Sequence, residues 1–258
     1  MPTELFVAMG GALSSFLSGL LGVGGGIVLT PWLLYAPAVV GSAGLPVKIV
    51  TGLTIAQAIS GSVIGTWRHA RYGNVSPRLV RVMGPTGAVA SFVGALVSAG
   101  TADRVLIAIF AAFSLLGALF LVLPERGPAQ PVDDLHVNVP VATALALCVG
   151  FFGGMVGIAA IAFIIAGLIY LLRIPPRVAI GSSLGIGMFS ALAALIGKAA
   201  TAQVEPLLAL IVFLAAIVWS PVGAYVSQRT RPRLLMQLLA VVVFLAGLRM
   251  AWQAVTGT

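Results

Sequence analysis

Long apolar runs recur along this chain, and each is close to the length that crosses a lipid bilayer as one helix. A spanning helix needs about 20 predominantly apolar residues. Hydrophobic residues make up 60% of the 258 residues and charged residues only 8%, whereas soluble domains carry about 25% charged residues. Runs of the required length cover residues 46–66, 79–99, 105–123, 178–197, 207–227 and 234–254. The sequence therefore predicts an all-α polytopic integral membrane protein, embedded in the lipid bilayer of a bacterial-type inner (cell) membrane.

Basic residues dominate the charge of the chain. The formal net charge is +8 at pH 7, and the Lys and Arg residues fall between the apolar runs. In a membrane protein such residues set the orientation of the spans, so we predict no nucleic-acid partner. Cys148 is the single cysteine, which excludes an intramolecular disulfide.

Residues 5–37 and 140–172 form two further apolar regions that contain glycines and are too long for one crossing. Each would measure about 50 Å as one helix, whereas the hydrocarbon core is about 30 Å thick. If each region enters and leaves on the same side, only four of the 14 Lys and Arg residues lie on the outer side, namely Lys48, Arg104, Lys198 and Arg249. A re-entrant hairpin and two full crossings give the same count, and both remain open.

The positive-inside rule favours this arrangement, since a single crossing of each region divides the basic residues evenly between the two sides. It predicts that the Arg-rich side is cytoplasmic. The loops on that side are 67–81, 124–139, 173–177 and 228–233.

The two halves of the chain repeat each other. An offset of 129 residues superimposes SFVGALVS (91–98) on SPVGAYVS (220–227), and an offset of 135 superimposes GLLGV (19–23) on GMVGI (154–158). We predict a first transmembrane repeat at residues 1–123, a Pro-rich cytoplasmic linker at 124–139 and a second transmembrane repeat at 140–258. Each repeat is predicted to be a glycine-interrupted hairpin plus three transmembrane helices. The span count inverts one repeat relative to the other, as is typical of secondary transporters.

Three consecutive glycines interrupt the first region in the stretch GLLGVGGGIVLTP. Glycine costs about 1 kcal/mol relative to alanine in a helix interior, so three in a row predict a break. The helix that begins after the break offers unpaired N–H groups and the positive end of its dipole to an anion. Close helix packing through small residues is the alternative role for such glycines. We predict that the substrate-binding residues here are Gly22, Gly24, Gly25 and Gly26.

The glycine motif, the Gly-Leu-Thr at 52–54, the WRHARYGNV after that span and the repeat of the whole arrangement resemble the TauE/SafE family of sulfite and organosulfonate exporters. The resemblance covers nearly the full chain. It implies transport of a small sulfur-containing anion such as sulfite or sulfoacetate. The second half departs from the pattern, because Ala159, Ala160 and Ile161 replace the glycine triplet. We therefore expect a more continuous helix there.

Polar side chains within the spans are the other candidate ligands, since polar groups are costly in a membrane. Thr51, Thr54 and Gln57 follow one helical stripe, and Ser182, Ser183 and Ser190 form a counterpart in the second half. Thr54 and Ser183 coincide under the repeat, and we predict that their hydroxyls donate to the anion. Hydrogen bonds between helices, or to carbonyls of the same helix, are the open alternative.

His69 and Lys198 also coincide under the repeat, each near the end of its helix. The helix dipole favours a cation there, and Lys198 can extend its ammonium to the interface. A role of His69, Lys198 and Ser190 in the transport path or in coupling is the second interpretation.

The sequence favours a carrier that works by alternating access over an enzyme. Acidic residues number six and histidines two, and we expect no catalytic residues, no metal and no cofactor. The spans hold no Asp or Glu relay, which leaves co-transport of a proton with the anion open. An anion channel and a non-transporting membrane helper protein are the alternative functions. The sequence does not indicate the oligomeric state.

Overall fold

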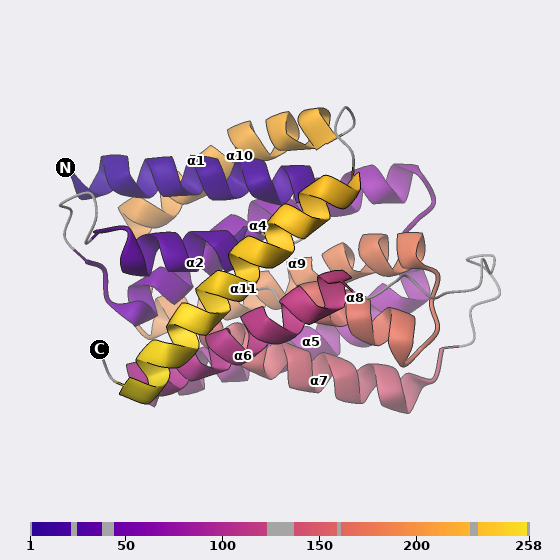
Figure 1. Cartoon of the computed structure of the whole chain (residues 1–258). Coiled ribbons are helices and arrows are strands. Elements are labelled where there is room, and N and C mark those ends of the chain that lie inside the picture. Colours follow the sequence, from indigo (N-terminus) through magenta and orange to yellow (C-terminus); the bar gives the residue numbers. More distant parts are fainter. Residues whose placement is uncertain are drawn as a thin grey trace.

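Helices form every regular element in the described part of the chain, which comprises residues 2–21, 25–37, 44–122, 137–158, 161–227 and 232–256 of a computed structural model (Figure 1). In chain order they are α1 (Thr3–Leu21), α2 (Gly26–Tyr35), α4 (Val47–Arg71), α5 (Pro77–Gly100), α6 (Asp103–Val122), α7 (Val139–Val156), α8 (Ile161–Tyr170), α9 (Pro176–Ala200), α10 (Pro206–Ser227) and α11 (Pro232–Thr256). The predicted all-α fold class is confirmed.

The six apolar runs predicted as spans lie in α4, α5, α6, α9, α10 and α11, which have 20 to 25 residues each. At 1.5 Å per residue such helices measure about 30–37 Å, enough to cross a membrane. Length and apolar composition qualify α1, α4, α5, α7, α9 and α10 as membrane-spanning helices. The chain is therefore a multi-pass membrane protein.

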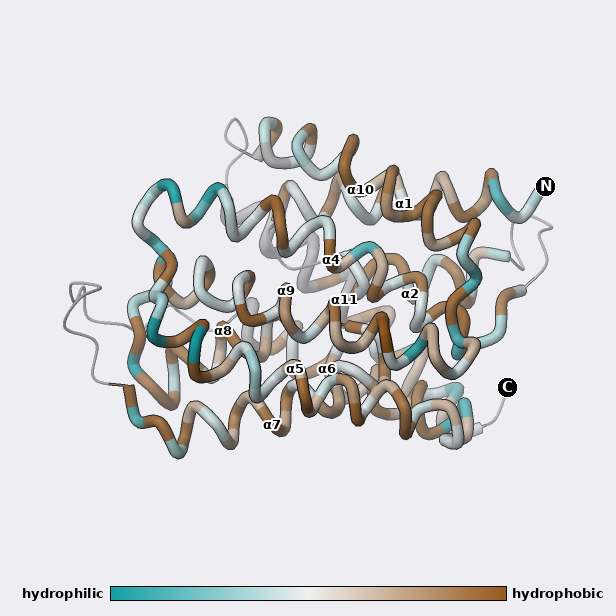
Figure 2. The backbone as a smooth tube through the Cα atoms, turned by 180° about the vertical axis from the view of Figure 1, so that it is seen from behind, coloured by the Kyte–Doolittle hydropathy of each residue, from teal (hydrophilic) through white to brown (hydrophobic). Residues whose placement is uncertain are grey.

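Hydrophilic residues gather mostly toward the two ends of the helix bundle, with apolar lengths of helix between them (Figure 2). The helices α4 and α9 form the centre, because 61% of the residues in their apolar windows are buried, against 28% in α10. Large apolar side chains point outward from the peripheral helices, as expected where lipid takes the place of water. Val89, Leu119, Leu214 and Leu248 are examples.

In the first glycine region, one described helix ends before the predicted break and another begins after it. The helix α1 ends at Leu21, and α2 begins at Gly26 with Gly25 as its N-cap. Gly22 and Gly24 lie outside the described residues. Figure 1 shows that α1 begins and α2 ends at the same end of the bundle, on the left, so the two helices form a hairpin.

The expectation of a more continuous helix in the second half is wrong. The helix α7 ends at Val156, and Gly157 takes a left-handed conformation with φ of 78°. Its N–H donates to the carbonyl of Gly153 at 3.0 Å, a common glycine C-cap. Gly157, which stands shortly before the positions aligned with the glycine triplet, is thus sufficient to end α7. The next helix, α8, begins at Ile161. In Figure 1, α7 begins and α8 ends on the right, opposite to the first hairpin.

Most of the contacts between helices are preserved when the two halves are exchanged. The helix α1 packs along α10, and its counterpart α7 packs along α5; α4 packs on α9, and α6 on α11. A Cβ added to glycines at equivalent positions would overlap backbone carbonyl groups at equivalent positions. The equivalent pairs are Gly19 on Ser220 and Gly154 on Ser91, Gly223 on Phe16 and Gly94 on Phe151, and Gly52 on Gln203 and Gly181 on Asn74. The sequence repeat is thus also a repeat of helix contacts.

The turns after α4 and α9 repeat the same hydrogen bonds. The N–H of Asn74 donates to the His69 carbonyl at 3.0 Å, and the N–H of Gln203 donates to the Lys198 carbonyl at 2.9 Å. Gly73 and Ala202 have positive φ values of 67° and 55°. The second turn therefore keeps its shape with alanine in place of glycine. The predicted domain boundaries and the inversion of the repeats across the membrane remain predictions.

Candidate functional site

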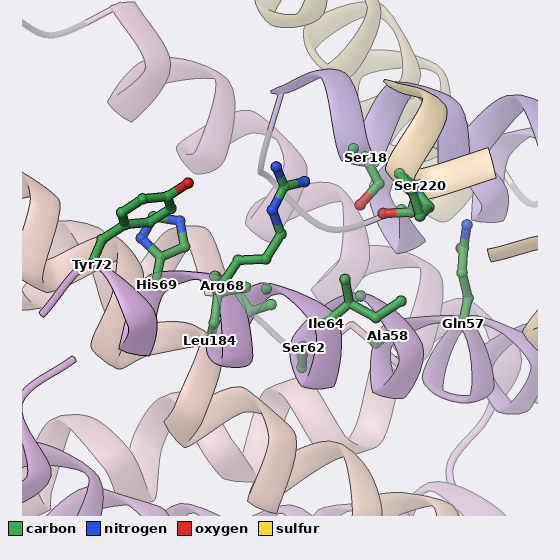
Figure 3. Close-up of a pocket in the computed structure, with 16 residues that line it drawn as sticks. Ser18, Gln57, Ala58, Ser62, Ile64, Arg68, His69, Tyr72, Leu184 and Ser220 are labelled. Atoms are coloured by element: carbon green, nitrogen blue, oxygen red, sulfur yellow. The ribbon is translucent and has the colours of Figure 1, made fainter. Parts of the chain in front are cut away.

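A cavity of about 290 Å³ lies between α1, α4, α9 and α10 and runs along α4. Gln57 lies at its inner end, and Arg68, His69 and Tyr72 lie at the end of α4 (Figure 3). Gly25 also lines the cavity and lies next to the Gln57 amide. Its other described lining residues are Ser18, Gly19, Ala58, Gly61, Ser62, Ile64, Gly65, Ile161, Leu184, Ser220 and Pro221. The break between α1 and α2 and the start of α8 therefore share one cavity.

Small residues on α4 make room for this cavity. Ala58, Gly61, Ser62 and Gly65 are three or four positions apart, so they share one face of the helix. A Cβ added to Gly61 would meet no atom within 4 Å. On the opposite wall, Ser18 from α1 and Ser220 from α10 supply hydroxyl groups (Figure 3).

The inner end of the cavity is formed by the glycine break and the amide of Gln57. A Cβ on Gly25 would overlap the Gln57 amide group, so any other residue at position 25 would displace this amide. Gln57 is 2% exposed, and its Nε2 donates to Ser14 Oγ at 2.7 Å and to Ser15 Oγ at 2.8 Å. Its Oε1 is buried with no hydrogen-bond partner among the described residues. Buried polar atoms are normally paired, so this amide has capacity for a ligand.

The two helix breaks meet at α4. A Cβ on Gly26 would lie 3.2 Å from Ile158 Cγ2 and 3.5 Å from Thr54 Cβ. A Cβ on Gly157 would overlap the Thr51 carbonyl oxygen. The segment of α4 from Thr51 to Gln57 therefore contacts both breaks, as one site shared by the two repeats requires.

The predicted hydroxyl ligands already have partners within their own helices. Thr51 Oγ1 donates to the Lys48 carbonyl at 2.7 Å, and Thr54 Oγ1 lies 2.9 Å from the Thr51 carbonyl. Ser183 Oγ donates to the Ile180 carbonyl at 2.8 Å. These contacts match the alternative of bonding to carbonyls of the same helix, and neither Thr54 nor Ser183 is among the cavity-lining residues. Donation from Thr54 and Ser183 to an anion stays a prediction.

Ser182 and Ser190, the other two predicted serines of the second half, contact different parts of the protein. Ser182 Oγ accepts a hydrogen bond from the Ser76 N–H at 2.9 Å and so fixes the start of α5 to α9. Ser190 Oγ is buried without a described partner and faces a second, small cavity. Of the predicted polar ligands, Gln57 is the one that lines the large cavity.

A second cavity of about 10 Å³ lies between α5, α7 and α9. Four of its lining residues are the repeat equivalents of lining residues of the large cavity. The equivalent pairs are Ser18 and Gly153, Gln57 and Ile186, Gly61 and Ser190, and Ser220 and Ser91. One copy of this space is therefore wide and the other is nearly filled, and we call them the open and the closed copy.

His69 and Lys198 occupy equivalent positions in the two halves but different surroundings. His69 is half-buried at the mouth of the large cavity, beside Arg68. Lys198 is 0% exposed, and its Nζ lies within hydrogen-bonding distance of four oxygens inside the protein. The interpretation that Lys198 extends its ammonium to the interface is therefore wrong.

Sequence reasoning missed Arg68, Ser18 and Ser220 as lining residues. Ser220 opens the repeated stretch SPVGAYVS, and Ser18 stands one residue before GLLGV, so both are polar residues next to the repeat motifs. That signal was available in the sequence. The position of Arg68 at the cavity mouth depends on the length of α4 and could not be read from the pattern.

The chain matches the sequence profile of the sulfite exporter TauE/SafE family over residues 7–250. It is similar to the probable membrane transporter protein YunE of Bacillus subtilis, with 22% identity over 95% of this chain and 96% of that protein. It is 31% identical to a probable membrane transporter protein of Xylella fastidiosa (strain 9a5c) over 72% of this chain and 71% of that protein. A probable membrane transporter protein of Haemophilus influenzae is 30% identical over 69% of this chain and 67% of that protein. No solved structure matches the chain.

Proposed function

We propose, from the premise that the chain belongs to the sulfite exporter TauE/SafE family, that it is a secondary carrier which exports a small sulfur-containing anion by alternating access. The candidate substrates are sulfite, sulfoacetate and related organosulfonates. The observation that carries the proposal is the large cavity, which ends at a glycine break with an amide of free hydrogen-bonding capacity.

The inner end of the cavity suits an anion. The first N–H groups of a helix have no partner within the helix and carry a partial positive charge, and α2 begins at Gly25 and Gly26 without a side-chain cap. A serine hydroxyl can donate as well as accept, so Ser15 can donate to Oε1 when the Gln57 amide turns and presents Nε2 to a ligand, while Ser14 donates to the Gly11 carbonyl at 3.3 Å. Backbone N–H groups and one amide N–H would then hold the oxygens of the anion.

Charge at the two ends of the bundle supports entry from the cytoplasm. The described arginines at the end where the cavity opens are Arg68, Arg71, Arg78, Arg81, Arg173 and Arg177. By the positive-inside rule this end is cytoplasmic. The positive charge of Arg68 at the mouth would attract an anion. A cavity that opens to the cytoplasm provides the loading site that export requires.

The pair of equivalent cavities supports alternating access. In a carrier built from two inverted repeats, the two repeats can pack differently, and the binding site then opens to one side of the membrane. When the repeats exchange their packings, the site opens to the other side. Here α5 packs closely on α9, while the equivalent pair α10 and α4 leaves the large cavity between them. The opposite orientation of the two hairpins in Figure 1 supports the inverted arrangement that this exchange needs. A channel would require both cavities to be open at once.

Thermal unfolding of the purified protein in the presence of sulfite, sulfoacetate, taurine, sulfate and chloride tests the binding step. A ligand at about 100 times its dissociation constant stabilises the folded state by roughly 2.7 kcal/mol. We expect a concentration-dependent shift with a sulfur-containing anion and none with chloride. If chloride stabilises the protein as much as sulfite does, that result would contradict the assignment of the substrate class.

A further inference from the structure

The most deeply buried charge among the described residues is the ammonium of Lys198, near the end of α9. The Nζ atom lies 2.9 Å from Thr51 Oγ1 on α4, 3.0 Å from Ser98 Oγ on α5, 3.1 Å from the Met155 carbonyl at the end of α7, and 3.1 Å from Gln203 Oε1 in the turn before α10. One side chain thus connects three neighbouring helices and a turn to α9.

All four partners are neutral oxygens. The Met155 carbonyl and Gln203 Oε1 can only accept, and the Thr51 hydroxyl donates its own hydrogen to the Lys48 carbonyl. Four acceptors around one nitrogen indicate an ammonium with its three N–H groups fully used. The acidic residues of the described chain, Glu4, Asp103 and Glu205, are exposed and are not among its partners. The four oxygens around Nζ therefore suit a positive charge, and no carboxylate in the described chain is among them.

The ammonium contacts two of the helices that line the small, closed copy of the cavity. Ser98 and Met155 belong to α5 and α7, the helices that line the small cavity together with α9. Under the repeat, Lys198 corresponds to His69 at the mouth of the open cavity. The large cavity thus has a nitrogen base from the end of α4 at its mouth, and the equivalent base at the end of α9 is Lys198, on a helix that lines the small cavity.

We propose that Lys198 is the anion-binding residue of the outward-facing state, an inference that rests on the proposed carrier function. In the inward-open state its ammonium is held by four neutral oxygens. When α5 and α7 move away from α4 and α9, Ser98 and the Met155 carbonyl leave the ammonium. The three oxygens of a sulfite or sulfonate group then take their place, so the transported anion neutralises the buried charge.

A comparison of binding with transport tests this role. Lys198→Met removes the charge and keeps much of the side-chain volume, and Lys198→Arg keeps the charge. Lys48→Met is the matched control, because Lys48 is a basic residue at the same end whose Nζ donates to the Ala99 carbonyl at 2.6 Å. Each variant is purified, reconstituted in vesicles and assayed for exchange of radiolabelled sulfite, and its sulfite affinity is measured in detergent by thermal unfolding.

We expect Lys198→Met to bind sulfite at the Gln57 end of the cavity with unchanged affinity and to lose exchange about 100-fold, the loss expected when the partner of a desolvated charge is removed. Lys198→Arg is expected to retain measurable exchange, and Lys48→Met to behave as wild type. Normal exchange by Lys198→Met would overturn the proposal. Equal loss of binding and exchange would also overturn it, because Lys198 would then support the inner site.

A second measurement needs no substrate. In a Cys148→Ala background, Ser190→Cys reports on the closed cavity and Ser62→Cys reports on the open one. We expect Lys198→Met to raise the rate at which a hydrophilic thiol reagent labels the cysteine at position 190, because α4, α5 and α7 lose their shared contact. An unchanged labelling rate would overturn the bridging role of the ammonium. If wild type binds no sulfur-containing anion, the proposed function fails by that result alone, whatever the labelling shows.

Discussion

Gln57→Glu is the substitution that tests the inner anion site most sharply. It exchanges an amide for a carboxyl group of nearly the same size, at a side chain that is 2% exposed and faces Gly25. A carboxylate there would lie about 4 Å from an anion held at the start of α2. At an effective dielectric constant of about 20, the repulsion amounts to roughly 4 kcal/mol. Since about 1.4 kcal/mol corresponds to a factor of ten, the affinity should fall by about 1,000-fold.

The assay is the ligand-dependent shift in thermal unfolding, at a sulfite concentration that is about 100 times the wild-type dissociation constant. At that concentration the variant would be about one-tenth saturated, and the stabilisation should drop from roughly 2.7 kcal/mol to about 0.1 kcal/mol or less. Gln253→Glu is the control, since this amide accepts a hydrogen bond from Tyr35 at 2.8 Å and is not among the described lining residues of the cavity. A folded Gln57→Glu protein with the full wild-type shift would refute the reasoning.

Three further predictions follow from the same contacts. Gly25→Ala places a Cβ on the Gln57 amide and should weaken sulfite binding about tenfold or more in the thermal assay; unchanged affinity would contradict the close approach. Gly94→Ala meets the Phe151 backbone and should lower the free energy of unfolding by about 1–3 kcal/mol. Gly100→Ala, which meets nothing within 4 Å, should not lower it, and equal losses would argue against the packing described. Arg68→Gln should slow anion association and weaken its salt dependence in stopped-flow binding; an unaltered salt dependence would remove Arg68 from the entry path.

The helices and the repeat were readable from the sequence because membranes constrain both strongly. Each apolar run of about 20 residues became a helix, since backbone groups in lipid must pair within their own segment. The offsets of 129 and 135 residues reappear as equivalent contacts, for example Gly19 on Ser220 and Gly154 on Ser91. A glycine at a close backbone contact is retained in both copies because no other residue fits.

The second break and the environment of Lys198 were not readable in the same way. The alanines at 159 and 160 favour helix, but Gly157 ends α7 before that preference acts. Lys198 stands at a helix end, where the helix dipole and the interface usually explain a cation. Its burial depends on α5 and α7, which approach it from distant parts of the sequence. The same holds for the cavity, whose walls combine residues from both halves of the chain.

Counterflow in reconstituted vesicles tests the carrier mechanism most directly. Vesicles are loaded with unlabelled sulfite or sulfoacetate, diluted into a low concentration of the radiolabelled anion, and sampled over time. Alternating access predicts a transient accumulation of label above its external concentration, driven by exchange through a site that faces one side at a time. Uptake that only equilibrates, with no overshoot and no dependence on the anion inside, would contradict the account and favour a channel.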